Sequence, residues 1–387
     1  MQFIDGGVTA PKGFTANGML CKIKESSTKN DLALVFSEKL CNAAGVFTQN
    51  KVKAESVKLT KENIANGKAQ AVIANSGNAN ACTGEQGAKV AQKMASLAAD
   101  VLGINSDDVI VYSTGVIGKQ LPVEKIEKNI QSLKDGLSKE GHKEARTAIM
   151  TTDTHYKECA VQTVIGGKTV RIGAMAKGSG MIHINMGTML SVMTTDCAIS
   201  SQMLEKALRK SVAGTYNCVS IDGDTSTNDS LTILANGMAG NDEITCEGED
   251  FEIFYEALNA INTQMAKKIA GDGEGATKLI ECNVSGAKDV ETARGLAKAA
   301  IFGSDANFGR FLCAMGYSGF DFSPEKTSIT FESAENSMRT GATDFIGEQK
   351  GKRTSLKVFE NGVPLDFDEA LAKKVLQEAE IKINIEC

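Results

Sequence analysis

A glycine–threonine pair near the middle of the chain could cut its own peptide bond. Gly187 and Thr188 precede an apolar, strand-like run, in the segment KGSGMIHINMGTMLSVMTTD at 177–196. A threonine hydroxyl is a poor nucleophile without a base beside it. If Thr188 attacks the Gly187 carbonyl, hydrolysis of the resulting ester frees the Thr188 α-amine. An α-amine has an ordinary pKa of about 7.7–8.0, which suits a general base. A Gly-Thr pair is also typical of a turn before a buried strand, so the pair alone does not decide.

A second candidate is the run YSTGVIGK at 112–119, directly after a predicted strand. Thr114 and Gly115 could offer a hydroxyl and backbone N–H groups to a developing oxyanion. The alternative is a glycine-assisted turn between a strand and a helix. A phosphate loop is not indicated, because the pattern GxxxxGK[ST] is not present.

Four polar, glycine-containing loops could line a shared site. Such loops are NSGNANACTG at 75–84, DGDTSTND at 222–229, GDGEGATK at 271–278 and FGSDANFGR at 302–310. One loop of this kind is usually structural, because small polar residues hold tight turns and caps. Four of them, each beside a predicted strand or helix, favour a common site.

Composition narrows the class of protein. The chain has 387 residues, of which 42% are hydrophobic and 23% charged, a balance typical of globular proteins. The net charge of -6 argues against nucleic acid or an anionic membrane as partner. The ten cysteines include no CxxC pair and the start resembles no secretory leader, so we expect reduced, mostly buried thiols in a cytoplasmic protein.

Histidines are few and poorly placed for a metal. None of the three lies in HExxH or beside a cysteine at ligand spacing, so we expect no zinc site. We expect a structural hydrogen-bonding role for His183, five residues before Thr188.

Predicted strands and helices alternate along the chain. Short β-branched runs at 71–74 and 109–112 indicate strands. Apolar residues at helical spacing predict helices at 87–102, 123–137, 201–212, 252–269 and 367–379. This alternation predicts an α/β or α+β fold built in layers. The small-residue segment 166–195 places a natural division between 187 and 188.

Taken together, these segments resemble the ornithine acetyltransferase family, the bifunctional glutamate N-acetyltransferase/amino-acid acetyltransferases of arginine biosynthesis. The resemblance follows the order of the family's motifs along nearly the whole chain. The matching motifs are GVTAPKGF (7–14), AGVFTQN (44–50), NSGNANACTG, STGVIG, MTTDT (150–154), KGSGMIH, MGTML and DGDTSTND.

The resemblance implies a self-cleaving enzyme with a ping-pong reaction. Thr188 would be the nucleophile, the Gly187–Thr188 bond the cleavage site, and Thr114 with Gly115 the oxyanion hole. N-acetylornithine would acetylate Thr188, ornithine would leave, and glutamate would take the acetyl group without a bound cofactor. The residues that would contact substrate are Thr151, Lys177, Thr188 and Glu274.

The resemblance also implies a layered αββα sandwich and two fragments. An alpha fragment, 1–187, would carry the oxyanion-hole and acyl-substrate loops. A beta fragment, 188–387, would begin at the nucleophile, and the two fragments would assemble as a heterotetramer. The run at 358–387 resembles the family's penultimate strand, helix and strand, so we expect the C-terminal tail to be missing, with Asn384 inside the last strand.

Three alternatives stay open at this point. The same self-cut architecture could serve an aminopeptidase-like hydrolase with an N-terminal threonine. A truncated homologue could be inactive. Acetyl-CoA is a candidate second acyl donor, which would add an amino-acid N-acetyltransferase activity.

Overall fold

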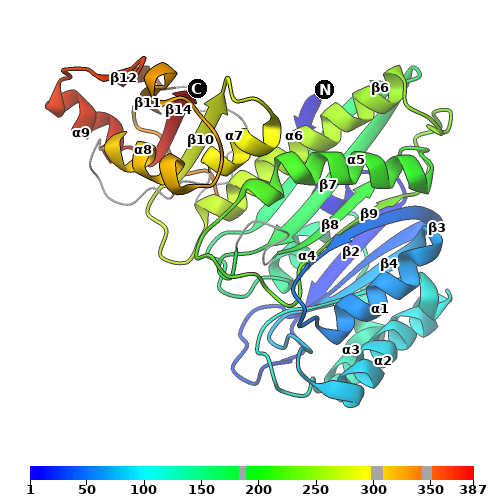
Figure 1. The fold of residues 1–387 in the computed structure, drawn as a ribbon. Helices are drawn as coiled ribbons and strands as arrows, with labels where there is room; N and C mark the ends of the chain where they lie inside the picture. Colours follow the sequence, from blue (N-terminus) through cyan, green and yellow to red (C-terminus); the bar gives the residue numbers. More distant parts are fainter. Residues whose placement is uncertain (183–188, 298–307, 342–350) are drawn as a thin grey trace. The chain divides into compact units, whose positions relative to one another are not determined.

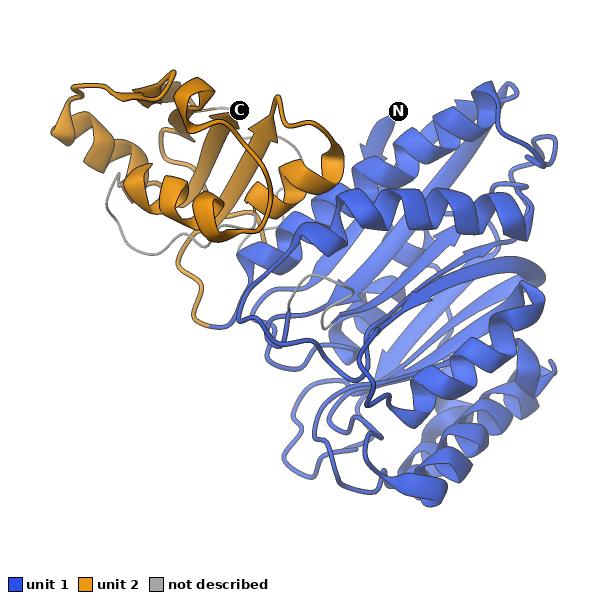
Figure 2. Cartoon of the chain, viewed as in Figure 1, with its two compact units in different colours: residues 1–274 blue, residues 275–387 orange. Residues whose placement is uncertain are grey.

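The computed structural model describes residues 1–182, 189–297, 308–341 and 351–387. The chain divides into two compact units, residues 1–274 and 275–387 (Figure 2). The predicted fragments 1–187 and 188–387 divide the chain by a chemical cut rather than by compactness, and they remain a prediction.

Unit 1 is built on one long, folded sheet. Its strand order is β1-β6-β7-β8-β9-β3-β4-β5, with β2 beside β3. The β4–β5 and β8–β9 pairs are parallel, and the other pairs are antiparallel. The strands are β1 (Gln2–Ile4), β2 (Phe14–Met19), β3 (Leu32–Phe47), β4 (Lys68–Asn75), β5 (Val109–Ser113), β6 (Lys157–Ile165), β7 (Lys168–Lys177), β8 (Leu190–Thr195) and β9 (Ser230–Ala235).

The 16-residue strand β3 carries the sheet from one layer to the next. Its first half pairs with β2 and with most of β4, whereas its second half pairs with β9 and with the start of β4. The register with β4 shifts between Phe36 and Cys41. An irregularity of this kind bends a strand and increases its twist, so the two halves of β3 can belong to two layers.

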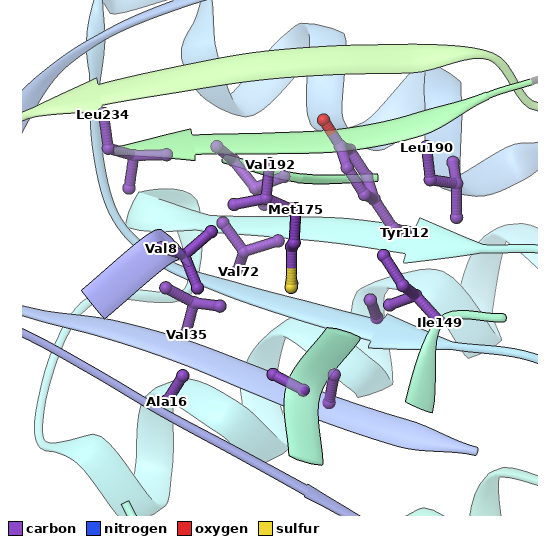
Figure 3. Close-up of a cluster of buried hydrophobic side chains, with 14 of the residues drawn as sticks. Val8, Ala16, Val35, Val72, Tyr112, Ile149, Met175, Leu190, Val192 and Leu234 are labelled. Carbon is purple, nitrogen blue, oxygen red and sulfur yellow. The ribbon is translucent and has the colours of Figure 1, made fainter. Parts of the chain in front are cut away.

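A buried apolar cluster fills the space between these two layers. Val35 and Val72 come from β3 and β4, whereas Met175 and Val192 come from β7 and β8, and all four belong to one cluster (Figure 3). The Tyr112 hydroxyl, on β5, donates to Thr232 Oγ1 at 2.8 Å across the same interior. Residues from both halves of the sheet therefore face one another, as in two sheets packed face to face.

Helices cover both outer faces of the sandwich. Leu34, Ile73 and Val111 form a second cluster with apolar residues of α2 and α3. On the other side, α6 packs on β6 and β7, and α5 packs on β3 and α6 (Figure 1). These helices are α1 (Glu55–Asn63), α2 (Gly84–Leu102), α3 (Val123–Asp135), α4 (His142–Ala148), α5 (Ser201–Gly214) and α6 (Glu249–Gly271). The layers run helix, sheet, sheet, helix, which confirms the predicted αββα sandwich.

Unit 2 is a smaller sheet with helices. Its strand order is β10-β14-β11-β12-β13, and β10 pairs with β14 in parallel. A third apolar cluster, including Phe331, Val358, Val375 and Ile383, joins strands and helices. The elements are β10 (Leu279–Ser285), α7 (Val290–Ala297), α8 (Phe308–Tyr317), β11 (Ser328–Ala334), β12 (Arg353–Glu360), β13 (Val363–Pro364), α9 (Glu369–Gln377) and β14 (Glu380–Glu386).

Most predicted elements are present with small changes of boundary. The helix predicted at 87–102 is α2 and begins three residues earlier, and the one predicted at 252–269 is α6. The predicted C-terminal order of strand, helix and strand is found in β12, α9 and β14, and Asn384 lies in β14 as expected.

The cysteines are free, but the expectation that most are buried was wrong. Cys21, Cys41, Cys159 and Cys197 are buried, whereas Cys82, Cys218, Cys246 and Cys313 are exposed and Cys282 and Cys387 are intermediate. Of the exposed ones, Cys82 and Cys246 lie in loops, whereas Cys218 lies in a short 3-10 helix and Cys313 in a helix of the second unit. Within the described ranges, no helix has the length and apolarity to cross a membrane.

Candidate active site

The loops singled out in the sequence meet at one end of the sandwich. Asn75 and Ser113 are partners at the ends of the parallel strands β4 and β5. Lys177, the last residue of β7, pairs with Leu190, the first of β8, and Leu190 pairs with Ser230, the first of β9. These two sets of strand ends lie beside opposite ends of the bent strand β3, and contacts between the loops that follow bring them together.

Thr114 and Gly115 follow β5 at this edge. The Thr114 N–H donates to the Asn75 carbonyl at 3.0 Å, so its hydroxyl is the group left to act on a ligand. Gly115 has a φ of +131°, and a Cβ there would lie 2.4 Å from the Gly77 carbonyl carbon. Only glycine fits this close approach and this conformation. The backbone of the predicted oxyanion loop is thus set by the neighbouring 75–84 loop.

Asparagine side chains join two of the polar loops to the predicted oxyanion loop. Asn228, in the DGDTSTND loop, donates from Nδ2 to the carbonyls of Ala79 and Ser113, each at 2.7 Å. Asn78 donates to the Lys119 and Gln120 carbonyls at 3.2 Å. These bonds satisfy backbone groups that no strand or helix would satisfy. The loops around 75–84, 113–120 and 222–229 therefore form one hydrogen-bonded cluster.

Lys177 lies buried beside the predicted oxyanion residue. Its ammonium is 3.5 Å from Thr114 Oγ1, and only 4% of the residue is exposed. Burial lowers the pKa of Lys177, while the charges of Asp153, Asp229 and Glu274 act in the opposite direction. These acidic neighbours stabilise the charged form of Lys177, and a buried ammonium attracts an anionic part of a ligand more strongly than one in water.

A second lysine lies one strand away, between two carboxylates. Lys157 Nζ is 2.7 Å from Asp153 Oδ1 and 2.6 Å from Asp272 Oδ2, and all three side chains are buried. Burial by itself would raise the pKa of Asp153, but the charges of Lys177 and Lys157 outweigh it and hold this pKa at about 2. The Asp153 carboxylate therefore interacts with two lysines: it accepts a hydrogen bond from Lys157, and its charge interacts with that of Lys177.

Thr151 and Glu274, the remaining described substrate candidates, are attached to the same cluster. The Thr151 N–H donates to Asp153 Oδ2 at 3.0 Å. The Glu274 N–H donates to the Ser179 carbonyl at 2.8 Å, and a Cβ on Gly180 would lie 2.8–2.9 Å from the Glu274 carboxylate. The Glu274 carboxylate thus lies beside the 177–180 segment, close enough for its charge to act on Lys177.

Asp229 fixes the residue that follows the predicted nucleophile. Its Oδ1 accepts the Met189 N–H at 2.9 Å, and the side chain is almost fully buried. Burial raises the pKa of Asp229 well above its ordinary value, despite the Met189 N–H and the Lys177 charge. Asp229 therefore holds the backbone directly before β8 in place.

Some predicted residues lie outside the described part of the chain. These are Gly187 and Thr188, together with His183 and most of the FGSDANFGR loop. The structure brings together Thr114, Gly115, Thr151, Lys177 and Glu274.

The structure adds four site residues that were not predicted, namely Asp153, Lys157, Asp229 and Asp272. The three aspartates lie inside the motifs MTTDT, DGDTSTND and GDGEGATK, so these motifs could have identified them. Lys157 is one of many lysines, and no spacing paired it with a carboxylate more than a hundred residues away.

Comparison with known proteins shows the family of the chain. The sequence profile of the ArgJ family matches residues 15–387. The arginine biosynthesis bifunctional protein ArgJ of Caldanaerobacter subterraneus is 49% identical over 395 residues, covering 100% of this chain and 93% of that protein. The protein of the same name from Symbiobacterium thermophilum is 47% identical, covering 98% of this chain and 92% of its own length.

Two solved structures carry related names. The crystal structure of arginine biosynthesis bifunctional protein ArgJ from Bacillus halodurans is 41% identical, with a TM-score of 0.45 over 49% of this chain and 97% of that one. Ornithine acetyltransferase from Mycobacterium tuberculosis, complexed with ornithine, is 38% identical, with a TM-score of 0.43 over 47% of this chain and 96% of that one. By the extent of the family match and the identity to its relatives, the chain belongs to the ArgJ family.

Proposed function

We propose that this chain cuts itself between Gly187 and Thr188 and then transfers an acetyl group from N-acetylornithine to glutamate through Thr188. The observation that carries the proposal is the meeting of Thr114, Lys177 and the start of β8 at one edge of the sandwich. Membership of a family of arginine-biosynthesis enzymes supplies the substrate class.

The self-cleavage step uses the threonine hydroxyl. Thr188 Oγ1 attacks the Gly187 carbonyl carbon, the C–N bond breaks, and the new ester is hydrolysed by water. The products are a Gly187 carboxylate and a free Thr188 α-amine. That amine is then the general base for its own hydroxyl.

The transfer step has two halves. Thr188 Oγ1 attacks the acetyl carbonyl of N-acetylornithine, the amide bond breaks, and ornithine leaves with the proton that the α-amine had taken. The glutamate amine then attacks the acetyl ester and leaves as N-acetylglutamate, which regenerates the hydroxyl. In both halves the Thr114 hydroxyl and the Gly115 N–H stabilise the oxyanion.

The charged residues of the site bind amino-acid substrates. Lys177 pairs with a substrate carboxylate and Glu274 with a substrate ammonium, while Thr151 contacts the substrate from its own loop. The two fragments remain together as a heterotetramer in the cytoplasm, and acetyl-CoA is a candidate second donor.

The direct test is product analysis. Purified protein mixed with N-acetylornithine and glutamate should yield ornithine and N-acetylglutamate without free acetate. Without glutamate, the beta fragment should gain the mass of one acetyl group. Release of acetate alone would indicate an aminopeptidase-like hydrolase instead, and absence of any product would contradict both readings.

A further inference from the structure

Four buried charges of alternating sign form a continuous series behind the site. Asp272 bonds to Lys157, and Lys157 bonds to Asp153. Asp153 in turn acts on Lys177, whose ammonium reaches the Thr114 hydroxyl. Lys157 is the first residue of β6 and Lys177 the last of the neighbouring strand β7. The Asp153 carboxylate offsets the repulsion between these two lysines, which lie on adjacent strands.

The carboxylates of this series also accept hydrogen bonds from the backbone of two loops. Asp153 Oδ1 accepts the Gly178 N–H at 2.7 Å, and Asp153 Oδ2 accepts the Thr151 N–H. Asp272 Oδ2 accepts the N–H groups of Thr154 and His155 at 3.0 and 3.2 Å.

The third loop is attached by the backbone of Asp272. The Ser179 hydroxyl donates to the Asp272 carbonyl at 2.7 Å, and two residues later the Glu274 N–H donates to the Ser179 carbonyl. The loops that carry Thr151, Lys177 and Glu274 are therefore all linked to Asp153 and Asp272, the two residues that Lys157 joins.

We propose that Lys157 is a positioning residue: by joining Asp153 to Asp272 it sets the positions of Lys177 and Glu274 for the two ends of an amino-acid substrate. The inference rests on the proposed function and deepens it. Lys157 is fully buried and touches no reacting atom by this reading, so it acts only through the groups it holds.

Stability alone gives a weak reason for this arrangement. Replacing a buried ion pair or triad by apolar side chains is often neutral or stabilising. What apolar side chains cannot supply is hydrogen-bond acceptors for loop N–H groups that belong to no helix or strand. Asp153, Lys157 and Asp272 therefore fix the direction and the spacing of the loops around them. A substrate with two charged ends requires binding groups at such a fixed spacing.

The test compares three variants with the wild-type protein. Lys157→Met combined with Asp153→Asn and Asp272→Asn removes all three charges together while leaving an oxygen acceptor on each asparagine. Lys157→Arg keeps the charge but changes its length and shape. Asp196→Asn is the matched control, because Asp196 is also a buried carboxylate that accepts two backbone N–H groups. It follows the far end of β8, roughly 20 Å from Leu190 along the strand.

For the triple variant and Lys157→Arg we expect self-cleavage into two fragments and urea unfolding close to that of wild type. Their KM for N-acetylornithine should rise about tenfold or more, with kcat changed by less than about threefold. Asp196→Asn should keep the wild-type KM.

Other results would overturn the proposal. It is wrong if both variants fold and keep the wild-type KM, if the loss falls on kcat alone, or if Asp196→Asn raises KM equally. Unfolding of both variants also contradicts it, because a role confined to positioning requires a folded protein. Failure of the wild-type protein to exchange acetyl would instead remove the proposed function, so the two failures are distinguishable.

Discussion

The interior of the sandwich and the Lys157 ion pairs at its edge are both buried but are held together in different ways. Between the sheets, Val35, Val72, Met175 and Val192 pack through non-directional apolar contacts. At the edge, Lys157 and its carboxylate partners are bonded at fixed distances and angles. The comparison suggests that stability resides mainly in the interior, whereas the geometry needed for chemistry resides in the edge cluster.

The largest effect should come from filling the space beside Gly115. In Gly115→Ala the new Cβ would meet the backbone of Gly77 and Asn78 at 2.4–2.5 Å, so the oxyanion loop must move. We expect kcat to fall about 100-fold or more, the scale for losing one oxyanion donor. Steady-state kinetics of acetyl transfer would measure it.

Gly118→Ala is the control for that variant. Gly118 lies in the same loop with a φ of +78°, but a Cβ there would meet nothing within 4 Å. The cost should be limited to backbone strain of roughly 1 kcal/mol, with kcat within about threefold of wild type. Equal losses in both variants would mean that loop strain, not the position of Gly115, is responsible.

Shortening an apolar side chain in the interior should lower stability and leave substrate binding unchanged. Leu234, in β9, is fully buried between the sheets, and Leu234→Ala should destabilise by about 2–5 kcal/mol in urea unfolding. KM should stay near the wild-type value in the fraction that remains folded. Val164→Ala, at a position 59% exposed, is the matched control and should change little. A tenfold rise in KM for Leu234→Ala would break the comparison between the two regions.

The smallest expected effect is on the stability of the protein at low pH. The folded-state pKa of Asp153 is about 2, below its ordinary value of 3.8, so its contribution is present above pH 3.8 and is lost as pH falls toward 2. That contribution is about 2 kcal/mol by linkage. Urea midpoints at pH 6 and pH 3 should show a smaller drop for Asp153→Asn than for wild type.

Asp196, a buried carboxylate whose pKa is shifted in the opposite direction, is the control for this prediction. Burial raises the pKa of Asp196, so its pH-dependent contribution is present at low pH and is lost as pH rises. Asp196→Asn should therefore leave the acid-side fall in place. If it abolished the fall, buried carboxylates in general would be responsible rather than Asp153.

The two regions also differ in how far the sequence predicts them. The helical spacing of Val90, Met94 and Leu97 predicts α2, because burying one face of a helix leaves a repeat that can be read along the chain. The bend in β3 leaves no such repeat, because it depends on which strands pair with each half.

The charge series at the edge depends even more on the folded chain. Asp153 and Asp272 are 119 positions apart in the sequence, and they meet only because β6 and the end of α6 bring their loops to one place. Motif resemblance identified the loops of Thr114, Lys177 and Glu274 but not the lysine that joins them. Side chains that act through other side chains have no local pattern of their own.

The most direct test of the central claim is the mass of the denatured protein. If Thr188 is the nucleophile of its own release, the wild-type protein should give two polypeptides, residues 1–187 and 188–387, and Thr188→Ala should give one intact chain. A second polypeptide that begins elsewhere while acetyl exchange persists, or a Thr188→Ala chain still cut at that bond, would contradict the account.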